Sequence, residues 1–480
     1  MKIILVVGAG LPGLVCAYQL VQAGHSVLLI ERGGELDKGS IQTTRYDYEL
    51  DSPWNKHSSE WRGNIKPQRH IGVGGSSVLF QGVSHLPSES VIRSWGIDIA
   101  RFRKAEQFVR GKLNIAGDTL PFHPLNSVSR HLYNSAEKLG WAVQPAPVAI
   151  LSSPKDGRPS CNHCGLCIYG CLPGDKSSAD NVWYPELKAH PNVKILTNTK
   201  VEGINLTAED SVESVSVLRN GVREKIIAGS VVLCAGVLET PKILKNSRQK
   251  LAPDGIGSAN VGKYLTGSLW ASLLVAGPES SKDGYMGVPT DIMIREFDKQ
   301  GIQLYQSRNM AGITGPMSAV GVHNDIIRSP DPRQWMQGYY PRLAGLTGFA
   351  ESSTSEVDQL IFSPEPEIQK LYTDADGEKT NQIKSLLQDW ANAAGAEILN
   401  EMSSHQSNVT GAMLRGTCRM GLEPNTSVVS PEGNIWGIKN LYIADASVIG
   451  RGMIADPSLF LQAYGAYVAD NIVGSAGANP

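Results

Sequence analysis

The stretch KIILVVGAGLPGLVCAYQLVQAGHSVLLIERG (residues 2–33) determines the fold class. Its apolar run at 3–7 predicts a strand buried on both faces, as in a parallel sheet. Residues 26–30 predict a second strand, and the segment between them, to about residue 23, predicts a helix. This order predicts a βαβ unit and therefore an α/β protein with a Rossmann-like nucleotide domain.

Three glycines, Gly8, Gly10 and Gly13, occupy the turn between this strand and the helix. In the G-x-G-x-x-G pattern the first allows a tight turn, the second lets a pyrophosphate approach the backbone, and the third lets helix and strand pack closely. Glu31 ends the second strand, where a carboxylate can accept a hydrogen bond from a ribose hydroxyl. The unit therefore predicts a dinucleotide site, although the motif alone does not separate FAD from NAD.

Four later segments carry a family resemblance. They are RHIGVGGSSVLFQGVSHLP (69–87), NVKILTNTKVEGI (192–204), GSVVLCAGVLETPKIL (229–244), and the stretch from GTCRMG (416–421) to ADPSLFLQAYGAYVADNIV (455–473). In order and spacing they resemble the glucose–methanol–choline (GMC) family of FAD-dependent oxidoreductases. The resemblance is weak between about 270 and 400, where a strand over 345–349 and a helix over about 379–402 are expected.

This resemblance implies two domains, which agrees with a length of 480 residues. A discontinuous Rossmann-like FAD-binding domain would take residues 1–95, 165–270 and 415–480. A second domain built on an antiparallel sheet would take residues 96–164 and 271–414.

The resemblance also implies which residues contact FAD. The backbone amides of Gly74 and Gly75, with the hydroxyls of Ser76 and Ser77, suit an anionic or polar ligand. Val201 is expected near the adenine and Asp445 near the pyrophosphate or ribityl chain. The other expected contacts are Ala235, Gly236 and Pro457.

The catalytic pair departs from the family pattern. The family usually has a histidine just before the GTC segment and a histidine or asparagine further on, and these positions match Met413 and Asp456. A thioether cannot act as a base near neutral pH, whereas a carboxylate beside an apolar flavin has its pKa raised toward a useful range. His405 is a second candidate if a local insertion displaces the histidine. Arg415 could hold a substrate carboxylate or form a surface salt bridge.

With Asp456 as the base, the chain would oxidise an alcohol, sugar or polyol-like CH–OH group by hydride transfer to flavin. The alternatives are a flavin-dependent desaturation or other biosynthetic step, an electron-transferring subunit with an iron–sulfur cluster, and a non-catalytic FAD-binding scaffold.

A cysteine-rich loop, CNHCGLCIYGC (161–171), follows the ferredoxin spacing C-x2-C-x2-C-x3-C, although Leu172 separates the last cysteine from Pro173. Three of its cysteines also match the spacing in dehydrogenase subunits that hold a [3Fe–4S] cluster and pass electrons to a partner subunit. Tetrahedral zinc and a purely structural role remain open. The candidate ligands are Cys161, Cys164, Cys167 and Cys171.

Composition excludes several other classes. The formal net charge is −2, without basic runs, which argues against a nucleic-acid partner. No apolar stretch approaches the roughly 18 residues of a membrane helix. We therefore expect a cytoplasmic protein that acts on a small-molecule substrate.

Overall fold

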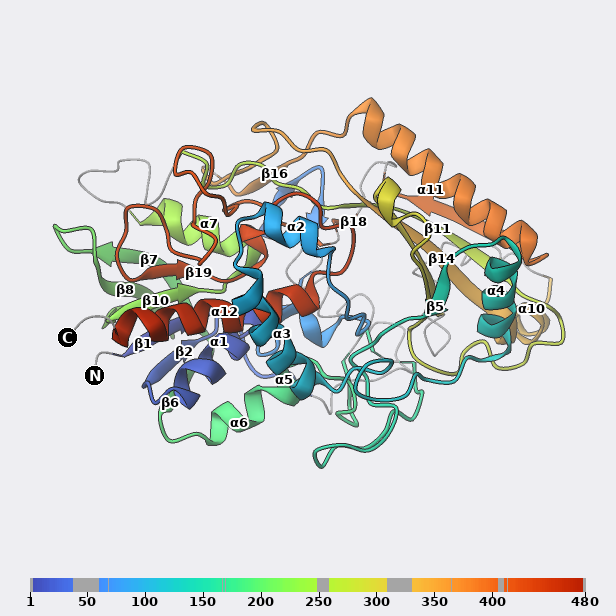
Figure 1. The fold of residues 1–480 in the computed structure, drawn as a ribbon, viewed down its shortest axis with the longest axis horizontal. Coiled ribbons are helices and arrows are strands. Elements are labelled where there is room, and N and C mark those ends of the chain that lie inside the picture. Colours follow the sequence, from blue (N-terminus) through green and yellow to red (C-terminus); the bar gives the residue numbers. More distant parts are fainter. Residues whose placement is uncertain are drawn as a thin grey trace.

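The computed structural model describes residues 3–37, 60–67, 69–165, 167–168, 170–247, 259–308, 330–363, 365–404, 410–411 and 413–477. Two sheet-based regions lie side by side (Figure 1). One contains β1 and its neighbours with α1 and α12, and the other contains β11 and β14 with α11 along its outer face.

The first region is built on a five-stranded parallel sheet, in the order β19-β10-β1-β2-β6. Its first, second, third and fourth strands in this order are apolar and almost completely buried, as expected for a parallel sheet with helices on both faces, whereas the edge strand β6 is only half-buried and exposes Lys194. This confirms the predicted βαβ unit, with bounds within one residue of those expected. The strands and flanking helices are β1 (Ile4–Val7), β2 (Val27–Ile30), β6 (Val193–Leu196), β10 (Ser230–Leu233), β19 (Leu441–Ile443), α1 (Leu11–Gln22), α6 (Tyr184–Ala189), α7 (Gly236–Asn246) and α12 (Ser458–Gly477).

The second region is built on a six-stranded antiparallel sheet, in the order β17-β11-β14-β13-β12-β5. One face of this sheet packs Leu304 and Leu346 against α4 and α11, in a core that includes Leu132 and Trp390. The opposite face of this sheet lies outside that core and is available for contacts with other elements. The elements are β5 (Val143–Pro145), β11 (Ser268–Ala276), β12 (Thr290–Ile294), β13 (Ile302–Arg308), β14 (Leu343–Glu351), β17 (Glu397–Ser403), α4 (Ser127–Lys138), α10 (Pro332–Tyr339) and α11 (Asp374–Ala393).

The remaining elements lie outside the two main sheets. The remaining strands are β3 (Arg62–Gly63), β4 (Lys66–Pro67), β7 (Thr199–Leu206), β8 (Val212–Arg219), β9 (Val222–Ile227), β15 (Gln359–Ile361), β16 (Glu367–Gln369) and β18 (Thr410–Gly411). The remaining helices are α2 (Glu89–Ser94), α3 (Ile99–Leu113), α5 (Ala179–Val182) and the single turns η4 (Gly75–Val78), η5 (Asp298–Gln300), η6 (Tyr340–Arg342) and η7 (Ala446–Val448). Across the described ranges, no helix combines the length and the apolar character needed to cross a bilayer.

Two sequence expectations differ from the structure. The helix expected over 379–402 is wrong at both ends, because α11 begins at Asp374, after the Thr373 cap, and ends at Ala393. Gly395 then adopts a φ of 57°, and the chain turns into β17. The segment 96–164 is also divided. Within it, α3 packs on the nucleotide side, with Phe102 stacked on Phe460 at 5.5 Å between ring centroids, whereas β5 pairs with β12.

Candidate functional site

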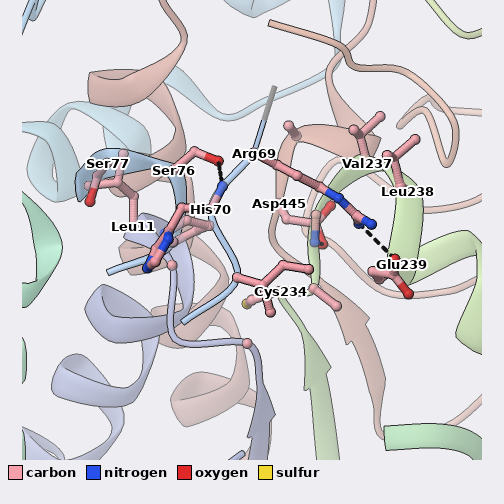
Figure 2. Close-up of a pocket in the computed structure, with 18 of the residues that line it drawn as sticks. Leu11, Arg69, His70, Ser76, Ser77, Cys234, Val237, Leu238, Glu239 and Asp445 are labelled. Carbon is pink, nitrogen blue, oxygen red and sulfur yellow. Dashed lines mark hydrogen bonds and ion pairs between the residues drawn. The ribbon is translucent and has the colours of Figure 1, made fainter. Parts of the chain in front are cut away.

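A cavity opens at the carboxyl ends of β1, β2 and β10, where open α/β sheets bind ligands. Figure 2 shows Ser76, Ser77 and His70 on one side of it and Arg69 with Glu239 on the other. Of the residues predicted to contact FAD, those that line this cavity are Gly8, Gly10, Glu31, Gly75, Ser76, Ser77, Val201, Ala235, Gly236, Asp445 and Pro457.

The three motif glycines play different structural roles. A Cβ added at Gly8, where φ is 106°, would lie 2.3 Å from the Cys234 carbonyl oxygen. A Cβ at Gly13 would lie 2.0 Å from the Gly8 oxygen. Gly10 differs, because its nearest atom would be the Gly75 Cα at 4.0 Å. Gly8 and Gly13 therefore allow close packing, whereas Gly10 leaves open space beside the cavity.

Two buried carboxylates hold the backbone around the cavity. Glu31 accepts hydrogen bonds from the Ala9 amide (2.8 Å) and the Gly33 amide (2.9 Å). Asp445 accepts from the Gly236 amide (2.8 Å) and the Ser447 amide (2.9 Å). Burial raises the pKa of both groups. Both side chains therefore fix the loops that a dinucleotide would contact.

The GGSS loop is only partly directed at the cavity. The Gly74 amide donates to the Ala9 oxygen (2.8 Å), and Gly74 does not line the cavity. The Ser77 hydroxyl donates to the Gly74 oxygen (2.6 Å) and accepts from the Ala179 amide (3.0 Å). The Gly75 amide donates to the Gly72 oxygen (2.9 Å), so the Ser76 hydroxyl remains as the polar contact that this loop offers to a ligand.

The residues present fit FAD. Gly10 and Gly236 border the cavity, and a Cβ on Gly236 would have no atom within 4 Å, so the backbone leaves room for close approach of an extended ligand. The cavity also lies at the beginning of α1, whose amide groups favour phosphate.

A second, smaller cavity of about 290 Å³ adjoins the first. Asp456 and Met413 line both cavities, so the structure brings the two predicted catalytic positions together at their junction. Asp456 is partly buried, and its Oδ1 accepts from the Ser458 amide (2.7 Å) at the start of α12. Loss of solvation raises the pKa of Asp456. A carboxyl group at this junction is placed to exchange a proton with a substrate in the second cavity.

The second cavity is lined mainly by residues that sequence reasoning missed. Arg69, at the start of a quoted segment, lines both cavities and pairs with Glu239 (2.7 Å) and Glu60 (2.7 Å). Gln81 and four residues of the antiparallel sheet complete the polar lining. The sheet residues are Thr290, Tyr305, Ser307 and Thr347.

Arg415 does not hold a substrate group. Its side chain is completely buried, and it lines neither cavity. Its guanidinium donates to the Met413 oxygen (2.9 Å) and to the Met453 oxygen, and pairs with Glu351 (3.3 Å). Arg415 instead holds Met413, whose φ is 54°, in a left-handed conformation. Both roles considered for Arg415, substrate binding and a surface salt bridge, are therefore wrong. His405 lies outside the described residues.

The cysteine-rich loop makes internal hydrogen bonds: the His163 amide donates to Cys161 Sγ (3.3 Å), and the Lys176 amide donates to Cys171 Sγ (3.3 Å). Cys171 Sγ donates to Asp175 Oδ1 (2.5 Å), and burial raises the pKa of Cys167 to about 11 and that of Cys171 to about 12. Within the described ranges, which include all four cysteines, no group of three or more His, Cys, Asp or Glu side chains is placed to hold a metal ion. The geometry therefore gives no support to the predicted cluster.

Buried Lys176 connects this loop to the cavity wall. Its Nζ donates to the Cys167 oxygen (2.5 Å) and to the Val78 oxygen (2.6 Å). The loop thus supports the segment that carries Leu79 and Phe80, which line the second cavity.

Comparison with known proteins agrees with this architecture. A paromamine 6'-oxidase from Streptomyces fradiae is 25% identical and matches 98% of this chain and 91% of its own length. A 2-methyl-1,2-propanediol dehydrogenase from Mycolicibacterium austroafricanum is 22% identical and matches 98% and 94%, respectively. A long-chain-alcohol oxidase from Arabidopsis thaliana is 24% identical and matches 98% and 68%.

The same fold occurs in the crystal structure of pyridoxine 4-oxidase from Mesorbium loti, with a TM-score of 0.71, 17% identity, and coverage of 98% of this chain and 99% of that one. Models of the N- and C-terminal parts of GMC oxidoreductases match residues 5–266 and 358–465, and the first alone covers more than half of the chain. The chain therefore belongs to the GMC oxidoreductase family, whose members bind FAD, and is an FAD-dependent oxidoreductase.

Proposed function

We propose that the protein oxidises a CH–OH group of a polar, hydroxyl-bearing small molecule, with Asp456 as the base. The observation that carries this proposal is the position of Asp456 at the junction of the two cavities. A substrate in the second cavity can reach this carboxylate and, at the same time, a cofactor in the first.

The cofactor and the protein would divide the chemistry. FAD, when bound, accepts the hydride that leaves the substrate carbon. Gly10 would offer its backbone amide, and Ser76 its hydroxyl, to FAD at the edge of the first cavity. Asp456 would take the proton of the substrate hydroxyl, and such a base contributes roughly 10²- to 10⁴-fold to the rate. Met413 cannot share this role, because its sulfur is only a weak acceptor.

The lining of the second cavity favours a substrate with several polar groups. Asp456 and Arg69 face it together with hydroxyl or amide groups of Ser76, Gln81, Thr290, Tyr305, Ser307 and Thr347. Several of these groups already pair within the protein, as Thr290 does with Gln81 (2.7 Å). A polar substrate can use their remaining hydrogen-bonding capacity, which a long alkyl chain cannot. The names of two relatives, which refer to paromamine and 2-methyl-1,2-propanediol, are consistent with a polar alcohol.

The test is anaerobic stopped-flow measurement of flavin reduction. The panel of alcohols follows the names of the relatives and comprises paromamine, 2-methyl-1,2-propanediol, pyridoxine and a long-chain alcohol. Asp456→Asn should slow reduction by the best substrate by roughly 100-fold or more. Asp470→Asn, further along α12, changes the same residue type away from both cavities and should leave the rate unchanged. An unchanged rate in Asp456→Asn would show that Asp456 is not the base.

The same protein sample distinguishes the alternatives. A carbonyl product supports alcohol oxidation, whereas a new carbon–carbon double bond indicates desaturation. Iron and acid-labile sulfide in stoichiometric amounts would restore the cluster at Cys161, Cys164, Cys167 and Cys171 and, with it, an electron-accepting partner subunit. A cytoplasmic location stays a prediction.

A further inference from the structure

Tyr305 lines the second cavity together with Asp456, and its side chain is held on several sides. It belongs to β13 and faces the cavity together with Thr347, its partner in β14. Its ring meets Phe349 edge to face at 5.8 Å between centroids. Its hydroxyl lies 2.7 Å from His85 Nε2 and 2.9 Å from Gln303 Oε1. All three polar side chains are almost completely buried. This network fixes the position of the phenol oxygen in a residue that lines the second cavity.

The proposed reaction needs a group with this chemistry. When an alcohol gives up its proton, negative charge develops on its oxygen, and a fixed hydrogen-bond donor stabilises that charge. An ionised Asp456 can only accept hydrogen bonds, and a methionine at position 413 offers no donor. The Asp456–Met413 pair therefore supplies a base without a donor.

We propose that Tyr305 is a catalytic residue that donates a hydrogen bond to the reacting oxygen, and that His85 is a positioning residue that holds the phenol for this role. This inference rests on the proposed function and adds the second partner of the hydroxyl group. The substrate proton passes to Asp456, and Tyr305 keeps its own proton throughout.

The environment of Tyr305 keeps it a donor. Burial, followed by the negative charge of Asp456, raises its pKa well above the ordinary value, so the phenol stays protonated. Both side chains line the second cavity. Tyr305 is thus suited to donating a hydrogen bond and unsuited to acting as the base.

The environment of His85 keeps the ring neutral. Burial lowers the pKa of His85 to about 4, so the ring carries one proton at neutral pH. Nδ1 lies 3.4 Å from the Leu86 oxygen, at the limit of a hydrogen bond, whereas Nε2 lies 2.7 Å from the Tyr305 oxygen. The proposal therefore places the ring proton on Nε2, so that His85 donates to Tyr305 and the phenolic hydrogen can turn from Gln303 toward the cavity.

The test compares Tyr305→Phe with wild-type holoenzyme in anaerobic flavin reduction, using the fastest alcohol of the panel above. The change removes one hydroxyl and keeps the ring that packs on Phe349. Reduction should slow roughly 10²- to 10³-fold, as when one donor to a developing oxyanion is lost. Tyr464→Phe removes a buried phenol outside both cavities and should leave the rate unchanged.

His85 gives a second readout. His85→Gln retains an N–H donor and should keep most of the rate, whereas His85→Leu should resemble Tyr305→Phe. The affinity for the alcohol provides a third readout. Tyr305→Phe should weaken binding of the alcohol and leave binding of its analogue without the reacting hydroxyl unchanged. Equal weakening for both compounds would indicate a merely structural role and overturn the inference.

The outcomes separate this inference from the proposed function. Slow reduction in both Asp456→Asn and Tyr305→Phe supports both proposals. Slow reduction in Asp456→Asn alone overturns the role of Tyr305 and leaves the base in place. Slow reduction in Tyr305→Phe alone overturns the role of Asp456 and leaves the donor in place.

Discussion

Gly10→Ala should weaken FAD binding while leaving the apoprotein folded. Gly10 has φ −81° and ψ −173°, an extended conformation that alanine adopts without strain. The new methyl group would have no protein atom closer than 4.0 Å, so it would project beside the cavity rather than into the core. The free energy of unfolding of the apoprotein should therefore change by less than about 1 kcal/mol.

The same methyl group would stand where the backbone meets the pyrophosphate. Forcing an extra methyl group into a close contact costs about 1–3 kcal/mol. This corresponds to a roughly 5- to 150-fold increase in the Kd for FAD. Titration of apoprotein with FAD, followed by fluorescence quenching, gives the Kd, and thermal unfolding without FAD gives the stability.

Gly13→Ala is the matched control, because its Cβ would lie 2.0 Å from the Gly8 oxygen. It should destabilise the apoprotein by at least about 1–3 kcal/mol, since the backbone of α1 and its preceding turn must move apart. A wild-type Kd for Gly10→Ala would refute the close approach of pyrophosphate at this glycine. A strongly destabilised Gly10→Ala apoprotein would show that the space beside Gly10 is not open.

Three further predictions concern the junction of the cavities. Arg415→Met should lower the free energy of unfolding, measured with denaturant, by about 3–5 kcal/mol, because it leaves Glu351 and two backbone carbonyls without their buried cation. A loss below about 1 kcal/mol would contradict this prediction. Met413→His should change the free energy of unfolding by less than about 1 kcal/mol and keep or raise the rate of flavin reduction, because histidine tolerates the φ of 54° at this position. Loss of bound FAD in Met413→His would contradict this prediction. Flavin reduction should accelerate as pH rises through the raised pKa of Asp456. Apoprotein stability should fall from about pH 3.9 up to that pKa, because ionisation costs more in the folded state. Asp456→Asn should remove both dependences, and their survival would assign them to another group.

The nucleotide side was predictable because its signals are local. The apolar run of β1, the glycines of the turn and the periodicity of α1 lie within one continuous stretch. Asp456 and Met413 were found because fixed motifs on either side of each position set the register. Their meeting at one junction followed from the family resemblance and could not be read from their separation in the chain.

The second region was harder to predict because its residues carry no motif. Alternation in IQLYQSR places Tyr305 and Ser307 on one face of β13. It does not show which face meets the cavity, because Leu304 and Tyr305 are both buried, one against helices and the other beside the cavity. The end of α11 was missed for a related reason. EILNEMS continues the helix plausibly in isolation, but it pairs with β11 as β17.

The substrate cavity has walls of two origins. Asp456 stands at the start of α12, which packs so closely on α1 that a Cβ at Gly465 would lie 2.6 Å from the Pro12 oxygen. The opposite wall comes from β13 and β14, whose pairing depends on backbone hydrogen bonds. Side chains such as Ser307 and Thr347 can therefore be exchanged without disturbing either the strand pairing or the glycine turn. The range of accepted alcohols can therefore evolve, because natural selection or directed evolution can alter such side chains while the cofactor site, Asp456 and Tyr305 are inherited intact.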